Sequence, residues 1–312
     1  MRTDNRRTLK PLSQVGTKQV LVDRATLLAA LKYALLAVGA LTMIAPFVDM
    51  LFGALRTPAE RLAVPQVYWP SDPQWSNFTR VFVELPMVKW LTNSVLITVV
   101  ITALQLATSA MAGYALAKYR FWGSNSLLRT VLGAQMFPFF LLMIPIFFLL
   151  RYVPLVGGNG FFGSGGNGLL NTYMAAILPF SISWYGIFLM RQFSMNVPDD
   201  VIDAARIDGA GEFRIFFTIV LPQLRASLAT LATFVFIYHW NEVIWTMTVT
   251  RSAPDLRTIP VGIYLLRGAF VDPSAESLQR AAVCISIIPI MIVFLALQRF
   301  YVRGLTAGSV KG

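Results

Sequence analysis

Long apolar stretches alternate with short polar segments along most of this chain. Six of the apolar stretches reach the roughly 20 residues that a helix needs to cross a hydrocarbon core. We predict transmembrane helices at about residues 27 or 32 to 55, 91–117, 127–150, 173–193, 224–250 and 281–301. The pattern therefore predicts an all-α integral membrane protein with six transmembrane helices.

The polar segments between these helices differ in character. Residues 56–90, 152–172 and 251–279 are rich in proline, tryptophan, glycine or arginine, and we interpret them as external loops. Within the second loop, the glycine-rich run 156–168 lacks the Lys-Ser/Thr ending of a phosphate-binding loop, so we expect a flexible external loop there. Residues 1–26 are polar and basic without the apolar core of a cleaved signal, which predicts a cytoplasmic tail before a membrane domain at 27–312.

Prolines mark two of the predicted helices. Pro46 should kink the first helix near its far end, and Pro138 and Pro145 interrupt the third stretch. A helix in lipid tolerates such prolines when neighbouring helices or water satisfy the freed carbonyl groups. We therefore expect the third helix to pack against other helices.

Composition and charge agree with a membrane location. The chain is 56% hydrophobic and only 13% charged, which is too apolar for an ordinary soluble domain of this length. Its net charge of +11 comes from residues spread between apolar runs, so we do not predict nucleic-acid binding. Of the 26 Lys and Arg residues, 17 fall in segments that the six-helix arrangement places inside, which predicts that both termini are cytoplasmic. A single cysteine, Cys284, and a single histidine, His239, exclude a Cys- or His-rich metal site.

One charged insert, residues 197–222, lies between the fourth and fifth apolar stretches. Pro198 and the acids behind it suit a helix start, and Gly209 and Gly211 suit its end, so the insert predicts a helix, a turn and a second helix. A third of the chain's 15 acidic residues gather here: Asp199, Asp200, Asp203, Asp208 and Glu212. An acidic surface beside the anionic cytoplasmic leaflet suits a protein partner better than lipid, although a solvated linker helix is the alternative.

Helical spacing places Val201, Ala204, Ala205 and Asp208 together. This face of small residues fits a groove on a partner protein. Ile202 and Arg206 share a different line along the helix. The insert is therefore predicted to dock through its small-residue face.

The insert also resembles a known family. Asp203-Ala204-Ala205, then Gly209, Ile219 and Leu221-Pro222, have the spacing of the EAA loop in membrane subunits of ABC importers, with Asp in place of the usual Glu. Further stretches resemble carbohydrate-uptake permeases related to the smaller membrane subunit of the maltose importer; they are residues 204–210, 217–222, Asn93-Ser94, Trp240-Asn241-Glu242 and the 304–312 tail. The resemblance covers roughly residues 30–312.

The resemblance implies a type I ABC importer permease fold for residues 27–312, in the plasma (inner) membrane of a prokaryote. It implies that the chain translocates a sugar or oligosaccharide delivered by an extracytoplasmic binding protein. Its other partners would be a second homologous permease subunit and two ATP-binding subunits. ATP and Mg would bind to those subunits, so this chain would hold no cofactor and would not itself be an enzyme.

In this family the insert is the coupling helix that docks on the ATP-hydrolysing subunit. The residues that match the family's loop, or lie beside the match, are Asp203, Ala204, Ala205, Asp208, Gly209, Ala210, Glu212, Leu221 and Pro222. The resemblance implies that these residues transmit ATP-driven motion to the membrane helices.

Polar and aromatic groups at membrane depth are candidates for the substrate pathway, because such groups face a bundle interior or a cavity. They are Asn93, Gln105, Gln135, Tyr238, Asn241, Glu242 and Trp245. Ordinary helix–helix packing is the alternative for each of them. His239 is expected to be a buried, hydrogen-bonded histidine.

Three rival interpretations remain at this stage. The solute could be glycerol phosphate or another small molecule instead of a sugar. A stand-alone membrane channel would need no ATPase partner. A membrane-embedded enzyme would need paired carboxylates, a serine with a base, or histidine ligands at facing positions, and the sequence shows none of these patterns.

Overall fold

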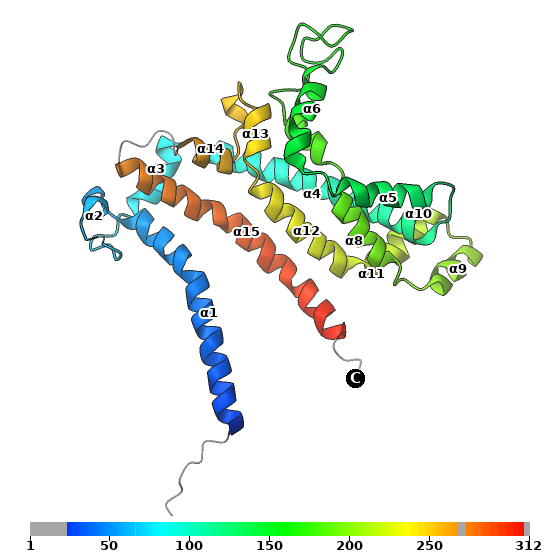
Figure 1. The fold of residues 1–312 in the computed structure, drawn as a ribbon, viewed down its shortest axis with the longest axis horizontal. Coiled ribbons are helices and arrows are strands. Elements are labelled where there is room, and N and C mark those ends of the chain that lie inside the picture. The colour runs from blue at the N-terminus through cyan, green and yellow to red at the C-terminus, as the bar shows by residue number, and fades with distance from the viewer. Residues whose placement is uncertain (1–23, 66, 267–272, 309–312) are drawn as a thin grey trace, which may run out of the picture. The chain divides into compact units, whose positions relative to one another are not determined.

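A computed structural model describes residues 24–65, 67–266 and 273–308 of the chain, and every regular element in those ranges is a helix (Figure 1). The chain divides into two compact units, Met1–Asp49 and Met50–Gly312. Most of the predicted tail, residues 1–26, lies outside the described residues, and the predicted boundary at residue 26 stays a prediction. At the other end, the final helix continues through Gly308.

The first predicted span is a continuous helix. α1 runs from Arg24 to Leu55 and contains Pro46 without a break. Its stretch from Thr26 to Leu55 is long and apolar enough to cross a membrane. Residues 24–49 are the described part of the first unit, and the rest of α1 opens the second unit.

The predicted loop at 56–90 contains two short helices, α2 (Pro58–Leu62) and α3 (Ser76–Glu84). A capping box begins α2, in which the Thr57 hydroxyl accepts from the Glu60 amide and the Glu60 carboxylate accepts from the Thr57 amide. Hydrogen bonds from Ser71, together with that from Thr57, lower the pKa of Glu60 to about 2. The segment is therefore a structured connection, as its mixture of proline and tryptophan predicts.

Two further spans are continuous helices, α4 (Met87–Lys118) and α15 (Pro273–Gly308). The third and fourth predicted spans are each two helical pieces joined at a bend. The fifth, predicted at 224–250, corresponds to a bent pair that begins earlier, at Glu212 within the insert, and ends at Trp240. By length and composition, the described residues hold three unbroken candidate spans, or up to six if each bent pair counts as one. The six-helix prediction is confirmed in that sense.

The bent pairs are the following. α5 (Ser124–Ala134) and α6 (Phe139–Arg151) meet at 105°. α7 (Tyr173–Ile177) with the 3-10 turn η1 (Leu178–Phe180) meets α8 (Trp184–Ser194) at 43°. The segment of α10 (Glu212–Ile215), the π-helical η2 (Phe216–Val220) and α11 (Leu221–Gln223) meets α12 (Arg225–Trp240) at 78°.

Proline explains the first bend. Pro138 has no amide hydrogen and an extended backbone, with ψ of 130°, so it separates α5 from α6. Pro145, in contrast, lies inside α6 without ending it. The interruption predicted for the span at 127–150 is therefore found at Pro138, and Pro145 does not add a second one.

The core of the second unit forms around α4, which packs against α8 and α12, while α12 also packs against α15 (Figure 1). Small residues bring α4 and α8 close together. A Cβ added to Gly113 would lie 2.7 Å from the Arg191 backbone nitrogen, and one added to Gly186 would lie 2.3 Å from the Ser109 hydroxyl. Close approach of small residues is how helices associate in a membrane.

Two predicted loops are more structured than expected. The segment 251–279 contains η3 (Pro254–Leu256), α14 (Ile259–Leu266) and the first residues of α15. In the glycine-rich loop, the Asn159 amide nitrogen donates to the carbonyls of Arg151 and Val153, and its oxygen accepts from the Gly166 amide. The glycines there set a defined backbone path, so the expectation of a merely flexible loop was incomplete.

Candidate functional site

The insert at 197–222 folds as predicted, into a helix, a turn and a second helical segment. α9 runs from Asp199 to Ile207, and α10 begins at Glu212. Pro198 precedes the helix instead of occupying its first position. Gly209 turns the chain with a φ of +81°, a backbone conformation that glycine adopts without strain.

The four residues of the predicted small-residue face of α9 differ in exposure. Ile202 is the one residue of α9 that is buried, at 2% exposure, and Ala205 packs partly against the same apolar core. Val201, Ala204 and Asp208 are exposed. Ala205 lies on the side of the helix that Ile202 buries, so it is less exposed than the other three, and its place in the docking face stays a prediction.

Lys118, the last residue of α4, reaches the start of α9. Its ammonium group donates to the carbonyl oxygen of Val197 at 2.6 Å and to the Asp199 carboxylate at 2.7 Å. The Lys118 side chain is only 7% exposed, whereas that of Asp199 is 74% exposed. The lysine thus ties the first residues of α9 to the end of α4.

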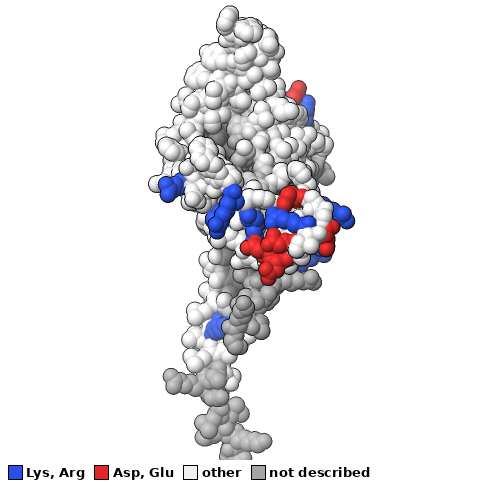
Figure 2. Space-filling view, turned by 90° about the vertical axis from the view of Figure 1, so that its right-hand side faces the viewer, with Lys and Arg blue, Asp and Glu red and all other residues white. Residues whose placement is uncertain are grey.

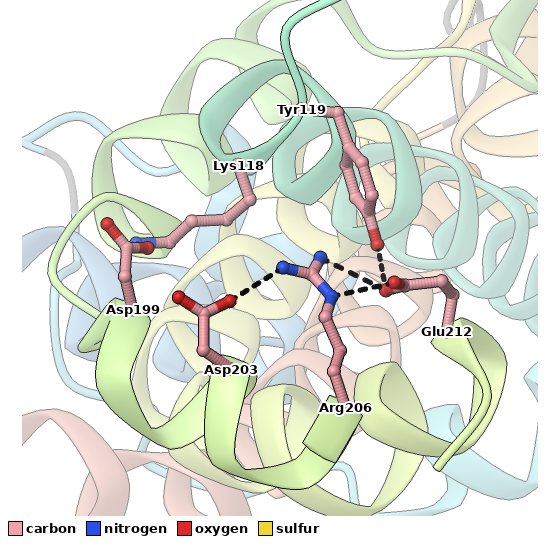
Figure 3. A network of polar contacts seen from close by, with 6 residues as sticks. All are labelled: Lys118, Tyr119, Asp199, Asp203, Arg206 and Glu212. Atoms are coloured by element: carbon pink, nitrogen blue, oxygen red, sulfur yellow. Dashed lines mark hydrogen bonds and ion pairs between the residues drawn. The ribbon is translucent and has the colours of Figure 1, made fainter. Parts of the chain in front are cut away.

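The next residue, Tyr119, is joined to the other end of α9 by the side chains of Glu212 and Arg206 (Figure 3). Its hydroxyl donates to the Glu212 carboxylate. Arg206 donates to the same carboxylate at 2.8 Å and to Asp203 at 2.9 Å, and its guanidinium lies 5.8 Å from the centre of the Tyr119 ring. Asp203, the residue that departs from the family's usual Glu, is therefore bonded within its own helix.

The network shifts the pKa values of its members. The Arg206 guanidinium, followed by the Tyr119 hydroxyl, lowers the pKa of Glu212 below its usual range. Burial, followed by the hydrogen bond to Glu212, raises the pKa of Tyr119. The hydrogen bond to Glu212 likewise raises the pKa of Arg206. At neutral pH the network therefore holds an ionised Glu212 between two protonated donors.

The outer surface of this region is acidic. Figure 2 shows acidic side chains gathered in one patch beside a few basic ones, with most of the same face uncharged. The five acids of the insert are all exposed residues. Two apolar side chains are exposed among them, Ile207 at 86% and Phe213 at 77%, and sequence reasoning did not single them out. The surface thus combines charge with apolar contact groups, as a docking surface for a protein does.

The remaining residues of the predicted coupling set lie nearer the core. Ala210 and Leu221 pack partly against it, and Pro222 lies in α11, next to the 78° bend before α12. These three occupy the connection between α9 and α12 instead of the outer surface. Their predicted coupling role stays a prediction.

A cavity of about 670 Å³ lies among α4, α8 and α12 and holds three of the predicted pathway residues, Gln105, Gln135 and Tyr238. Mostly aromatic and aliphatic side chains line it, together with a few polar ones, and no acid, lysine or arginine is among the lining residues. The Gln105 amide nitrogen donates to the carbonyl oxygen of Phe180 at 2.7 Å and lies 3.1 Å from His239 Nε2. His239 is buried, as expected, and its Nε2 has Gln105 as a partner, whereas its Nδ1 is buried without a hydrogen-bond partner among the described residues.

The other four pathway candidates are engaged elsewhere in this conformation. Asn93 donates to the carbonyls of residues 255 and 257 and accepts from Tyr173. Glu242 caps α13 (Ile244–Val249) by accepting from the amides of residues 245 and 246. Trp245 is fully buried, with its indole N–H on the Ala175 carbonyl, and Asn241 is exposed and bonds the carbonyl one turn before it. The structure thus gives these residues packing and capping contacts, and their pathway role stays a prediction.

Comparison with known proteins places this geometry in a family. Residues 105–307 match the family described as binding-protein-dependent transport system inner membrane component. The arabinooligosaccharides transport system permease protein of Halalkalibacterium halodurans is 36% identical over 270 residues, which are 86% of this chain and 91% of that protein. The lactose transport system permease protein of Rhizobium radiobacter is 33% identical, over 90% of this chain and 95% of that protein.

Other relatives carry different names. The sn-glycerol-3-phosphate transport system permease protein of Yersinia pestis is 30% identical, over 87% of this chain and 93% of that protein. Among solved structures, a bacterial ABC transporter involved in the import of the acidic polysaccharide alginate has a chain with a TM-score of 0.73 and 24% identity. The alignment covers 89% of this chain and 98% of that chain. The fold is therefore shared along nearly the whole chain.

Proposed function

The chain belongs to the family of binding-protein-dependent transport system inner membrane components, and on that premise we propose that it is a permease subunit of an ATP-driven importer for a sugar or oligosaccharide. The observation that carries the proposal is α9, a short exposed helix with acidic and apolar groups, joined to the end of a membrane-spanning helix. An ATP-binding subunit docks on α9, and its motion on ATP reaches the membrane helices through that contact.

The cavity beside α4 supports a sugar as the solute. Its aromatic side chains offer ring faces, and Gln105, Gln135 and Tyr238 offer amide and hydroxyl groups for hydrogen bonds. Because no charged side chain lines the cavity, an uncharged saccharide suits it better than a phosphate ester. The names of the arabinooligosaccharide and lactose relatives agree with this choice.

The partners and placement follow from the same assignment. The chain pairs with a second homologous permease subunit, two ATP-binding subunits hold ATP and Mg, and an extracytoplasmic binding protein delivers the solute. The chain spans the plasma membrane of a prokaryote several times, with both termini and α9 in the cytoplasm. The excess of Lys and Arg in the segments assigned inside supports this orientation.

The docking role is tested with a charge on the outer face of α9. Ala204→Glu places a carboxylate on an exposed position of that face, whereas Ala205→Glu would also disturb the core. We expect Ala204→Glu to lower uptake by about tenfold or more, since about 1.4 kcal/mol of lost docking free energy gives that factor. Uptake of radiolabelled lactose and arabinooligosaccharide into cells, with co-purified ATPase subunits quantified, measures the effect.

The matched control is Ala59→Glu, which makes the same change at an exposed position of another short helix, α2. It should leave uptake and subunit recovery at wild-type values. If Ala204→Glu transports as well as Ala59→Glu, α9 is not the docking site. Transport of glycerol phosphate instead of either sugar would overturn the proposed substrate class.

A further inference from the structure

α9 is held to its own chain by few contacts. Of its nine residues only Ile202 is buried, and the other side of the helix faces outward. A helix of nine residues is about 13 Å long, so the apolar contact that Ile202 makes near its middle, with Ala205 partly packed beside it, acts as a pivot. With that contact alone, a force on either end would tilt α9 instead of moving the helices behind it.

Two polar contacts restrain the two ends of α9 about this pivot. Lys118 holds the start of α9 through Val197 and Asp199, and Tyr119 holds the far end through Glu212, which Arg206 joins to the helix (Figure 3). Both contacts start from consecutive residues at the end of α4. They therefore fix the orientation of α9 relative to one membrane-spanning helix.

We propose that Lys118 and Tyr119 are positioning residues that clamp both ends of α9 to the end of α4, so that α9 and α4 move as one rigid body. The inference rests on the proposed function, because the force on α9 is the one that the docked ATPase subunit exerts. The clamp itself is a property of this chain, so it can be tested with or without that subunit.

Distances between spin labels test the clamp in the full complex in nanodiscs. Cys284, the only cysteine, is first replaced by serine. One label is placed on α4 at Met111, and the second on α9 at either Asp200 or Ile207, all of which are exposed. We expect one narrow distance for each pair, identical in the nucleotide-free and the ATP–vanadate-trapped complex.

The variants should loosen α9 one end at a time. Lys118→Met removes the ammonium group and should broaden the distances from Met111 to Asp200. Tyr119→Phe removes only the hydroxyl and should broaden those from Met111 to Ile207. Lys118→Arg keeps a cationic donor and should restore a narrow distribution, which a general loss of packing would not allow.

Two substitutions outside the clamp are matched controls. Lys89→Met removes a lysine at the opposite end of α4 that also pairs with an aspartate, Asp255. Tyr264→Phe removes an exposed hydroxyl on α14. Neither should change either distance, and equal broadening in these controls would overturn the clamp.

Other outcomes also decide the matter. If either wild-type distance shifts between the two nucleotide states, α9 and α4 do not move as one body. If the Lys118→Met and Tyr119→Phe variants keep narrow distributions, the two residues do not position α9. A chain that purifies without any ATPase subunit would contradict the proposed function, while its nucleotide-free distances would still test the clamp.

Discussion

At the scale of single residues, Glu212 is the group on which the far end of α9 depends. Its carboxylate accepts from both Tyr119 and Arg206, and Asp203 is the other carboxylate that faces that arginine. Because the folded-state pKa of Glu212 lies below its ordinary value of 4.5, ionisation of Glu212 stabilises the folded network above that pH. This contribution is lost as the pH falls through the lowered folded-state pKa.

The lowered pKa of Glu212 gives a prediction for the spin-labelled pair at Met111 and Ile207. The distance distribution should stay narrow from neutral pH down to about 4.5 and broaden below it, as Glu212 takes up a proton and the two donors lose their acceptor. Glu212→Gln should be broad at neutral pH already and respond less to acid. A wild-type distribution equally narrow across the whole titration would contradict the assignment.

The sequence identified many of these residues without showing how they are joined. Asp203, Gly209 and Glu212 were selected from the spacing of the insert, because the sequence itself shows which residues are charged and which are glycines. Lys118 appears there only as a basic end to an apolar stretch, because its partner Asp199 lies 81 positions later. Ala205 is half-buried beside Ile202, and helical spacing alone does not reveal which side of α9 is buried.

At the scale of elements, the glycine-rich loop is the clearest difference from the sequence prediction. A flexible loop needs no particular glycine, but this backbone does. Gly157 has a φ of +59°, and a Cβ there would lie 2.0 Å from the carbonyl oxygen of Gly168. Gly160 has no such restriction, since its added Cβ would meet the Ser164 oxygen at an ordinary 3.7 Å.

These two glycines give a matched pair of variants. Gly157→Ala should destabilise the loop by about 1–3 kcal/mol, because alanine is strained in the left-handed region and collides with backbone there. Gly160→Ala should change its stability by no more than about 0.5 kcal/mol. Hydrogen exchange of the amides in residues 152–172 measures both, and equal protection in the two variants would show that the loop has no fixed conformation.

The helices themselves were predictable where they are long and unbroken. α1, α4 and α15 coincide with apolar stretches because length and apolar composition define a membrane span. The bends were not predictable from the same information. Pro138 lies between two helices and Pro145 lies inside one, although both are prolines in one apolar run.

At the scale of the whole molecule, contacts join residues that are far apart in sequence at the place where the proposed ATPase motion is transmitted to the membrane helices. Lys118, the last residue of α4, bonds Asp199 at the start of α9, which lies 81 positions later, and the following residue, Tyr119, bonds Glu212 just beyond the end of α9, which lies 93 positions later. The sequence predicted six apolar spans and an exposed acidic insert, which were enough for the class of protein. The contacts between the end of α4 and the insert could be seen only in the structure, because no sequence pattern within either segment indicates them.

The central claim is that α9 receives an ATPase subunit. The most direct measurement is site-specific photo-cross-linking with benzoylphenylalanine at Ile207, which is 86% exposed beside the acidic patch, and at Phe162, which is 90% exposed in the glycine-rich loop. The account predicts a cross-link from position 207 to the ATP-binding subunit and none to that subunit from position 162. No cross-link to an ATPase from position 207, in a complex that hydrolyses ATP, would contradict it.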